Sequence, residues 1–145
     1  MELKQIDGGI HIDERGTVSF VNDFQFDQVK RFYTVRNHRS PFIRAWHGHK
    51  KEGKYVTVVN GSAIIGAIKI ENWDNPSENK DISKFVLSST KPSILSIPSG
   101  YANGMMTLEK DTIIMVFSTS SLEESLKDDI RFDSKQWDIW EIKEK

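Results

Sequence analysis

Short runs of apolar and β-branched residues recur along the chain and are separated by turns rich in Gly, Pro, Asn and Ser. Val, Ile, Phe, Tyr and Thr dominate these runs, and such residues favour the pleated, half-buried surface of a sheet. No segment before residue 120 shows the periodicity of an amphipathic helix. The pattern predicts strands over Thr17–Val21, Val29–Val35, Ile43–His47, Lys54–Asn60, Ser62–Ile70, Lys84–Leu87, Ile94–Ile97 and Thr112–Thr119.

Two local signals refine this pattern. Asn60-Gly61 lies between two predicted strands. It predicts a hairpin with a type I′ turn, which needs positive φ at both central residues. Ser121–Lys127 is the one segment expected to form a helix, because Ser121 can cap it and Glu123 and Glu124 lie in its first turn.

Many short strands with Gly/Pro turns indicate a sandwich or a barrel. The number of strands and the hairpin spacing favour an all-β jelly-roll barrel with a short C-terminal helical segment. The mouth of such a barrel can hold a small ligand. The 145 residues are 37% hydrophobic and 28% charged, without a linker or repeat, so one domain over residues 1–145 is expected.

Charge and composition exclude several classes of protein. A net charge of −1 argues against a nucleic-acid partner, which a strongly basic chain would favour. The chain has no cysteine, so disulfides and thiolate chemistry are excluded. Met1–Gln5 has no apolar run that would indicate a signal peptide. No stretch approaches the ~20 apolar residues of a membrane span, so the expected location is the cytoplasm.

The most informative chemistry is a His-x-His pair, His47 and His49, on a predicted strand. Residues i and i+2 of a strand face the same side, so both imidazoles share one face. Arg44 lies just upstream and Lys54 begins the following strand. Alone, such a pair is more often exposed or structural than catalytic. Two cations beside it favour a site that binds an anion and moves a proton near neutral pH.

A metal centre is not expected at this pair. A metal site in this kind of barrel needs two histidines, a carboxylate a few residues on, and a third histidine after a Pro-x-Gly turn. Glu52 lies too close to the histidine pair, and Asn103 occupies the position of the third histidine. Two histidines and an amide make a poor ligand set. Asn103 is instead expected to act as a neutral hydrogen-bond donor facing the pocket.

Other polar residues leave two interpretations open. Tyr33 shares a strand face with Arg31 and is either a structural residue or a proton donor, since a buried Tyr hydroxyl needs a partner. Asp128-Asp129 is either a solvated turn or the source of a carboxylate that orients a histidine.

Taken together, these motifs resemble the RmlC-like cupins, which act on dTDP-4-keto-6-deoxy sugars. The resemblance extends from about residue 10 to residue 140. It combines features of 3,5-epimerases, in the Pro-x-Gly turn and the Lys54 strand, with features of 3,4-ketoisomerases. The motifs are Asp13-x-Arg15-Gly16, Lys30-Arg31-Phe32-Tyr33, Arg44-x-x-His47-x-His49-Lys50, Lys54-Tyr55-Val56-x-Val58-x-x-Gly61 and Ile97-Pro98-x-Gly100-Tyr101-Ala102-Asn103-Gly104.

The resemblance implies a role for each candidate residue. His47 would be the base that removes the proton next to the ketone, with His49 and Tyr33 as further catalytic candidates. Arg44 and Lys54 would bind the sugar and stabilise the enolate oxygen, and Asn103 would contact the substrate. Arg15 would contact the diphosphate across the interface of a homodimer that exchanges N-terminal strands. No metal or other cofactor is implied.

One departure from the epimerase pattern concerns the general acid. Phe117 falls where the epimerases carry a tyrosine, and phenylalanine cannot donate a proton. The leading interpretation is therefore an epimerase of a dTDP-4-keto-6-deoxyhexose whose acid is still to be found. The alternatives are a 3,4-ketoisomerase with the same base, and a sugar-binding cupin that has lost catalysis.

Overall fold

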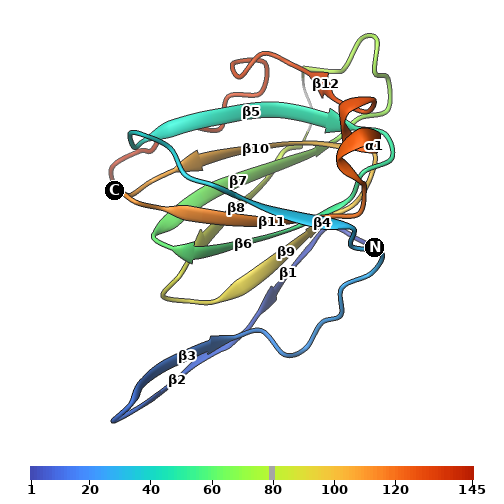
Figure 1. The fold of residues 1–145 in the computed structure, drawn as a ribbon. Helices are drawn as coiled ribbons and strands as arrows, with labels where there is room; N and C mark the ends of the chain where they lie inside the picture. The colour runs from blue at the N-terminus through green and yellow to red at the C-terminus, as the bar shows by residue number, and fades with distance from the viewer. Residues whose placement is uncertain (79–80) are drawn as a thin grey trace.

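The computed structural model describes residues 1–78 and 81–145 of the chain. Within them, two five-stranded antiparallel sheets face each other and a two-stranded hairpin extends away from both (Figure 1). The first sheet has the order β1 (Lys4–Asp7), β9 (Ser93–Ile97), β6 (Lys54–Asn60), β11 (Ile113–Ser118), β4 (Arg31–Val35). The second has the order β12 (Ile130–Arg131), β5 (Phe42–His49), β10 (Tyr101–Thr107), β7 (Ser62–Lys69), β8 (Ser83–Ser88). The hairpin is β2 (Gly9–Asp13) with β3 (Gly16–Phe20). This all-β architecture confirms the predicted jelly-roll barrel.

Apolar side chains fill the space between the sheets. Alternation along β7 turns Ala63 and Ile65 toward Val56 and Val116 of the first sheet, while Ile64 faces the other way. A second cluster covers the outer face of the second sheet, where the C-terminal segment packs three tryptophans together: Trp46, Trp137 and Trp140. The middle of the barrel interior is therefore apolar.

The prediction of a hairpin at Asn60-Gly61 is wrong. β6 and β7 lie in opposite sheets, so this turn is a corner at which the chain crosses the barrel. Asn60 remains the last residue of β6 and donates its side-chain amide to the Asp111 carbonyl at 2.8 Å. Only glycine suits position 61, because its φ is 79° and a Cβ there would lie 2.3 Å from Thr112 Oγ1.

The other predicted elements are present, with ends that differ by a few residues. The predicted helix is confirmed as α1 (Leu122–Leu126), which begins after the N-cap Ser121 with a capping box to Glu124. None of the described helical residues forms a segment long and apolar enough to cross a membrane. The sequence pattern does not predict four of the strands: β1, β2, β10 and β12. β10 is buried on both faces because it packs against the barrel interior on one side and the tryptophan cluster on the other.

Candidate active site

The helix α1 lies at one end of the barrel (Figure 1), and polar side chains gather inside the barrel at that end. In the first sheet, Lys54 on β6 is paired with Ser118 on β11, and Ser118 with Arg31 on β4. These three residues share the inward face because Val56, Val116 and Tyr33, two positions further along their strands, pack in the inner core. In the second sheet, His47 and His49 lie on the inward face of β5, opposite Asn103 and Tyr101 of β10. The predicted common face of the two histidines is therefore present.

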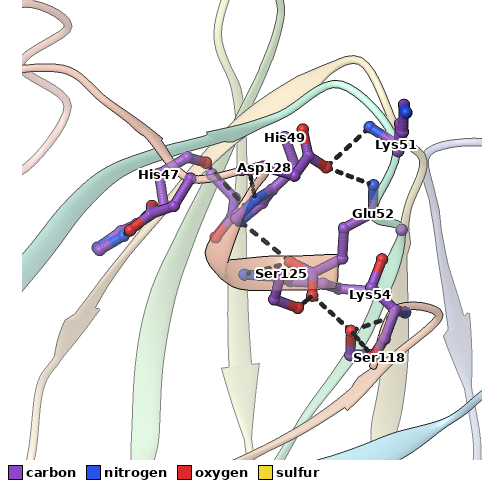
Figure 2. A network of polar contacts seen from close by, with 12 residues as sticks. His47, His49, Lys51, Glu52, Lys54, Ser118, Ser125 and Asp128 are labelled. Atoms are coloured by element: carbon purple, nitrogen blue, oxygen red, sulfur yellow. Dashed lines mark hydrogen bonds and ion pairs between the residues drawn. The ribbon is translucent and has the colours of Figure 1, made fainter. Parts of the chain in front are cut away.

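Glu52 lies at the centre of this polar end and is 3% exposed (Figure 2). Its Oε1 accepts hydrogen bonds from the hydroxyls of Ser118, at 2.5 Å, and Ser125 of α1. Its Oε2 lies 3.2 Å from His49 Nε2 and 3.6 Å from Lys54 Nζ. One carboxylate therefore joins β5, β6, β11 and α1.

The ionisation of Glu52 follows from these neighbours. Burial alone would raise the pKa of the carboxyl, but the Lys54 ammonium, the hydroxyls of Ser118 and Ser125, and His49 hold it below its ordinary value. Arg31 adds a second cation, with Nη2 at 3.7 Å from Oε1. Glu52 is therefore a buried anion between two cations.

Asp128, just after α1, fixes the loop that carries Glu52. Its carboxylate accepts the backbone N–H groups of Lys50, Lys51 and Glu52 at 2.8, 2.9 and 3.0 Å. Its backbone carbonyl lies 2.6 Å from His49 Nδ1. A carbonyl only accepts, so Nδ1 of His49 carries a proton and donates it to Asp128.

The two histidines consequently differ in what they offer a ligand. His49 is 5% exposed, with Nδ1 bound to Asp128 and Nε2 turned toward Glu52. Burial and Lys54 lower its pKa, while Glu52 acts in the opposite sense. His47 is more open, with 29% of its side chain exposed and Nδ1 at 3.9 Å from an oxygen of Asp129.

The environment of His47 keeps its imidazole neutral. Burial, followed by the nearby Lys54 and Arg131 cations, lowers the pKa of His47 from 6.5 to about 4, against the opposing effect of Asp129. A neutral imidazole at pH 7 accepts a proton, and a partner carboxylate stabilises the imidazolium that then forms. His47 and Asp129 thus have the composition of a general-base pair.

The remaining site residues suggested by the sequence differ in whether they reach the polar cluster. Tyr33 lies on the inward face of β4, its ring 5.0 Å from the Arg31 guanidinium carbon. The side-chain amide of Asn103 donates to the His47 carbonyl at 3.3 Å, so this donor joins two strands instead of facing a pocket freely. Arg44 is exposed on β5, and its Nε donates to Asn37 at 2.7 Å. The structure therefore brings Tyr33 and Asn103 to the cluster and gives Arg44 a different contact.

Arg15 and Phe117 lie outside the barrel interior. Arg15 is at the tip of the β2–β3 hairpin, paired with Asp13 at 2.6 Å. Phe117 lies on the outer face of the first sheet against Phe26 and Phe32, with ring centroids 4.5 and 6.2 Å away. The expectation that Phe117 occupies the acid position is therefore wrong, because β11 turns its neighbours toward the interior.

Sequence reasoning misses several members of the cluster. It weighs Glu52 only as a metal ligand, and it gives Ser118, Ser125 and Arg31 no function. The alternation of β4 is enough to place Arg31 beside Tyr33, but no sequence signal joins Ser125 to Glu52. Within residues 1–78 and 81–145, no three His, Asp or Glu side chains are grouped so that they could hold a metal ion.

The fold and the polar cluster define the class of protein as a jelly-roll barrel with a site of His, Lys, Arg and Glu side chains at one end. The family model described as dTDP-4-dehydrorhamnose 3,5-epimerase matches residues 2–144. The chain therefore belongs to this family of isomerases of dTDP-linked sugars. None of the curated proteins compared with the chain matches it.

Solved structures share the fold at low sequence identity. A variant of a 3,4-ketoisomerase from Thermoanaerobacterium thermosaccharolyticum, in complex with TDP-4-keto-6-deoxyglucose, is 20% identical with a TM-score of 0.69, covering 90% of this chain and 87% of that one. A dTDP-6-deoxy-D-glucose-3,5-epimerase from Legionella pneumophila, in complex with dTDP-4-keto-L-rhamnose, is 21% identical with a TM-score of 0.71, covering 89% and 71%. A 3′-monoepimerase from Streptomyces bikiniensis, in complex with dTDP-quinovose, is 15% identical with a TM-score of 0.66, covering 82% and 64%.

Proposed function

We propose that the protein epimerises a dTDP-4-keto-6-deoxyhexose by removing a proton next to the ketone. The observation that carries the proposal is His47, a neutral imidazole on the inward face with one oxygen of Asp129 at 3.9 Å, while the other oxygen of Asp129 accepts from Arg131 at 3.1 Å. A base with a low pKa stays unprotonated at neutral pH, and because the α-proton of a ketone is only weakly acidic, its removal also requires stabilisation of the enolate. The complexes of the related structures with dTDP-linked ligands support this class of substrate.

The cations of the cluster would stabilise the enolate. Proton removal places negative charge on the ketone oxygen, and preorganised positive groups in a water-poor site stabilise that charge strongly. Lys54 is 7% exposed and lies close enough to influence the pKa of His47. We assign Lys54 to the enolate oxygen and Arg31 to a supporting position behind it.

Tyr33 is the strongest candidate for the acid that returns the proton. β11 presents Val116 and Ser118 inward, and Ser118 already donates to Glu52. Tyr33 carries the phenol on the inward face of β4, beside Arg31. A phenol hydroxyl can donate a proton, which the phenylalanine at position 117 cannot do.

The test is solvent exchange on dTDP-4-keto-6-deoxyglucose in D₂O, followed by proton NMR. We expect deuterium at C3, with an inverted product, and less at C5. Movement of the ketone from C4 to C3 would instead identify a 3,4-ketoisomerase. No exchange with any keto sugar would favour a binding protein without catalysis.

The low pKa of His47 predicts an unusual pH profile. The unprotonated base is present above its pKa of about 4 and is lost as the pH falls through that value. We therefore expect kcat/KM to hold from neutral pH down to about 5 and to fall about tenfold per pH unit below about 4. Asp129→Asn removes a group that raises this pKa, so the acid limb should move to lower pH. An acid limb near 6.5 in the wild-type enzyme would contradict the role of His47.

We further propose a homodimer held by the β2–β3 hairpin. This hairpin pairs with no other strand of the described residues and exposes Ile12 by 70% and Val18 by 62%. An isolated two-stranded hairpin is marginally stable in water, and its apolar residues need cover. We expect twice the monomer mass in light scattering at micromolar concentration. Ile12→Asp should lower that mass, whereas Val86→Asp, on the exposed face of β8, should not. A fully active wild-type monomer would refute the proposal.

A further inference from the structure

The proposed reaction uses His47, Lys54 and Tyr33 but leaves Glu52 without a part. We propose that Glu52 is a positioning residue whose negative charge holds Lys54 and Arg31 at the inner end of the barrel. The inference rests on the proposed function only for what Lys54 acts on. The placement of the three charged groups stands on the structure itself.

The two oxygens of Glu52 have separate partners (Figure 2). Oε1 accepts the hydroxyls of Ser118 and Ser125 at hydrogen-bonding distance. Oε2 faces His49 and Lys54 at 3.2 and 3.6 Å. The hydroxyls therefore hold one oxygen in place and leave the other directed at the ionisable groups.

No direct hydrogen bond joins Glu52 to its two cations, although Arg31 Nη2 donates to Ser125 Oγ at 3.0 Å and Ser125 donates in turn to Glu52. Lys54 Nζ and Arg31 Nη2 lie 3.6 and 3.7 Å from the carboxylate, beyond the range of a good hydrogen bond. Lys54 is nevertheless almost fully buried, and a buried ammonium is strongly destabilised unless an opposite charge lies near it. Glu52 supplies that charge.

Glu52 is the fixed member of this group. Its backbone N–H donates to the Asp128 carboxylate at 3.0 Å, so the loop sets its position independently of Lys54. Lys54 has a four-carbon stem with many rotamers. Removing the charge of Glu52 should therefore let the Lys54 ammonium leave the place where it would meet an enolate oxygen.

The test compares Glu52→Gln, which keeps the shape and one acceptor oxygen but removes the charge, with two other variants. Ser125→Ala keeps the charge but removes the hydroxyl between Glu52 and Arg31. Glu124→Gln changes an exposed carboxylate on α1.

The first readout is the NMR titration of the His49 ring. The titratable and charged groups facing it are Lys54 on β6, Glu52 in the loop and Asp128 after α1, with Arg31 on β4 behind Glu52. His47 on the same strand and Tyr101 on β10 complete this set. Glu52→Gln removes the anion that raises the pKa of His49 and also releases Lys54, whose lowering effect is larger, so the His49 midpoint should move to higher pH. Glu124→Gln should leave the midpoint in place.

A second substitution removes the cation directly. Lys54→Met takes away the group that lowers the pKa of His49, so the midpoint should again move to higher pH. This comparison remains available if Glu52→Gln does not fold. A lower or unchanged midpoint in folded Glu52→Gln, an equal shift in Ser125→Ala, or a downward shift in Lys54→Met would overturn the proposal.

The second readout is activity. A misplacement of about 1 Å at a reacting group can cost about 10²-fold in rate, so Glu52→Gln should lose about that factor in kcat with a smaller change in KM. Glu124→Gln should keep the wild-type rate. A wild-type protein that exchanges no keto sugar would refute the proposed epimerase alone, because the His49 titrations would still decide the role of Glu52. Wild-type kcat in folded Glu52→Gln would overturn the role of Glu52 alone.

Discussion

Replacing His47 with Ala is expected to lower turnover by about 10²–10⁴-fold while the barrel stays folded. His47 is the imidazole of the pair that is open to a ligand, and its side chain lies in neither apolar core cluster. Its removal takes away the base and leaves the packing intact. Deuterium incorporation into the keto sugar measures the first effect, and thermal unfolding measures the second.

The matched control is His38→Ala, an exposed histidine in the loop between β4 and β5. It should keep the wild-type rate. Binding of dTDP should be similar in wild type and His47→Ala, because the base is assigned to the sugar ring and not to the nucleotide. Exchange at the wild-type rate in folded His47→Ala would remove His47 from the mechanism.

Replacing Lys54 with Met is expected to lower kcat by about 10²–10³-fold, the usual cost of removing one preorganised group from a developing oxyanion. Met keeps most of the apolar stem, so the change removes the ammonium with little loss of packing. The measurement is single-turnover exchange, with Lys51→Met as the control because Lys51 is exposed on the neighbouring loop. Equal losses in the two variants would indicate that charge near the site, not Lys54 itself, supports the reaction.

The amino-acid sequence is informative wherever a strand alternates. The period of two by itself places His47 and His49 on one face, and the same rule applied to β4 places Arg31 with Tyr33. Sequence patterns fail where two conformations share one signal. Asn60-Gly61 is typical of a hairpin turn, but a glycine with positive φ also serves a corner between sheets, and local sequence does not distinguish them.

The centre of the site is unpredictable for a different reason. Glu52 lies in a polar stretch, Lys50–Gly53, that resembles any solvated loop. Its burial depends on Ser118, Ser125 and Asp128, which are more than 60 positions away and come together only when α1 packs on the end of the barrel. Phe117 shows the same limit, since an error of one position in an aligned strand turns an inward residue outward.

The Asp128 carboxylate also has a consequence for local opening of the chain. Amide hydrogens in a surface loop normally exchange with solvent quickly, but three consecutive ones at Lys50–Glu52 are bound to a single side chain. They should therefore become accessible together, in one cooperative event, when the segment around residue 128 detaches. Hydrogen-exchange mass spectrometry would then report this loop and the C-terminal segment as one unit, although more than 70 residues of sequence separate them.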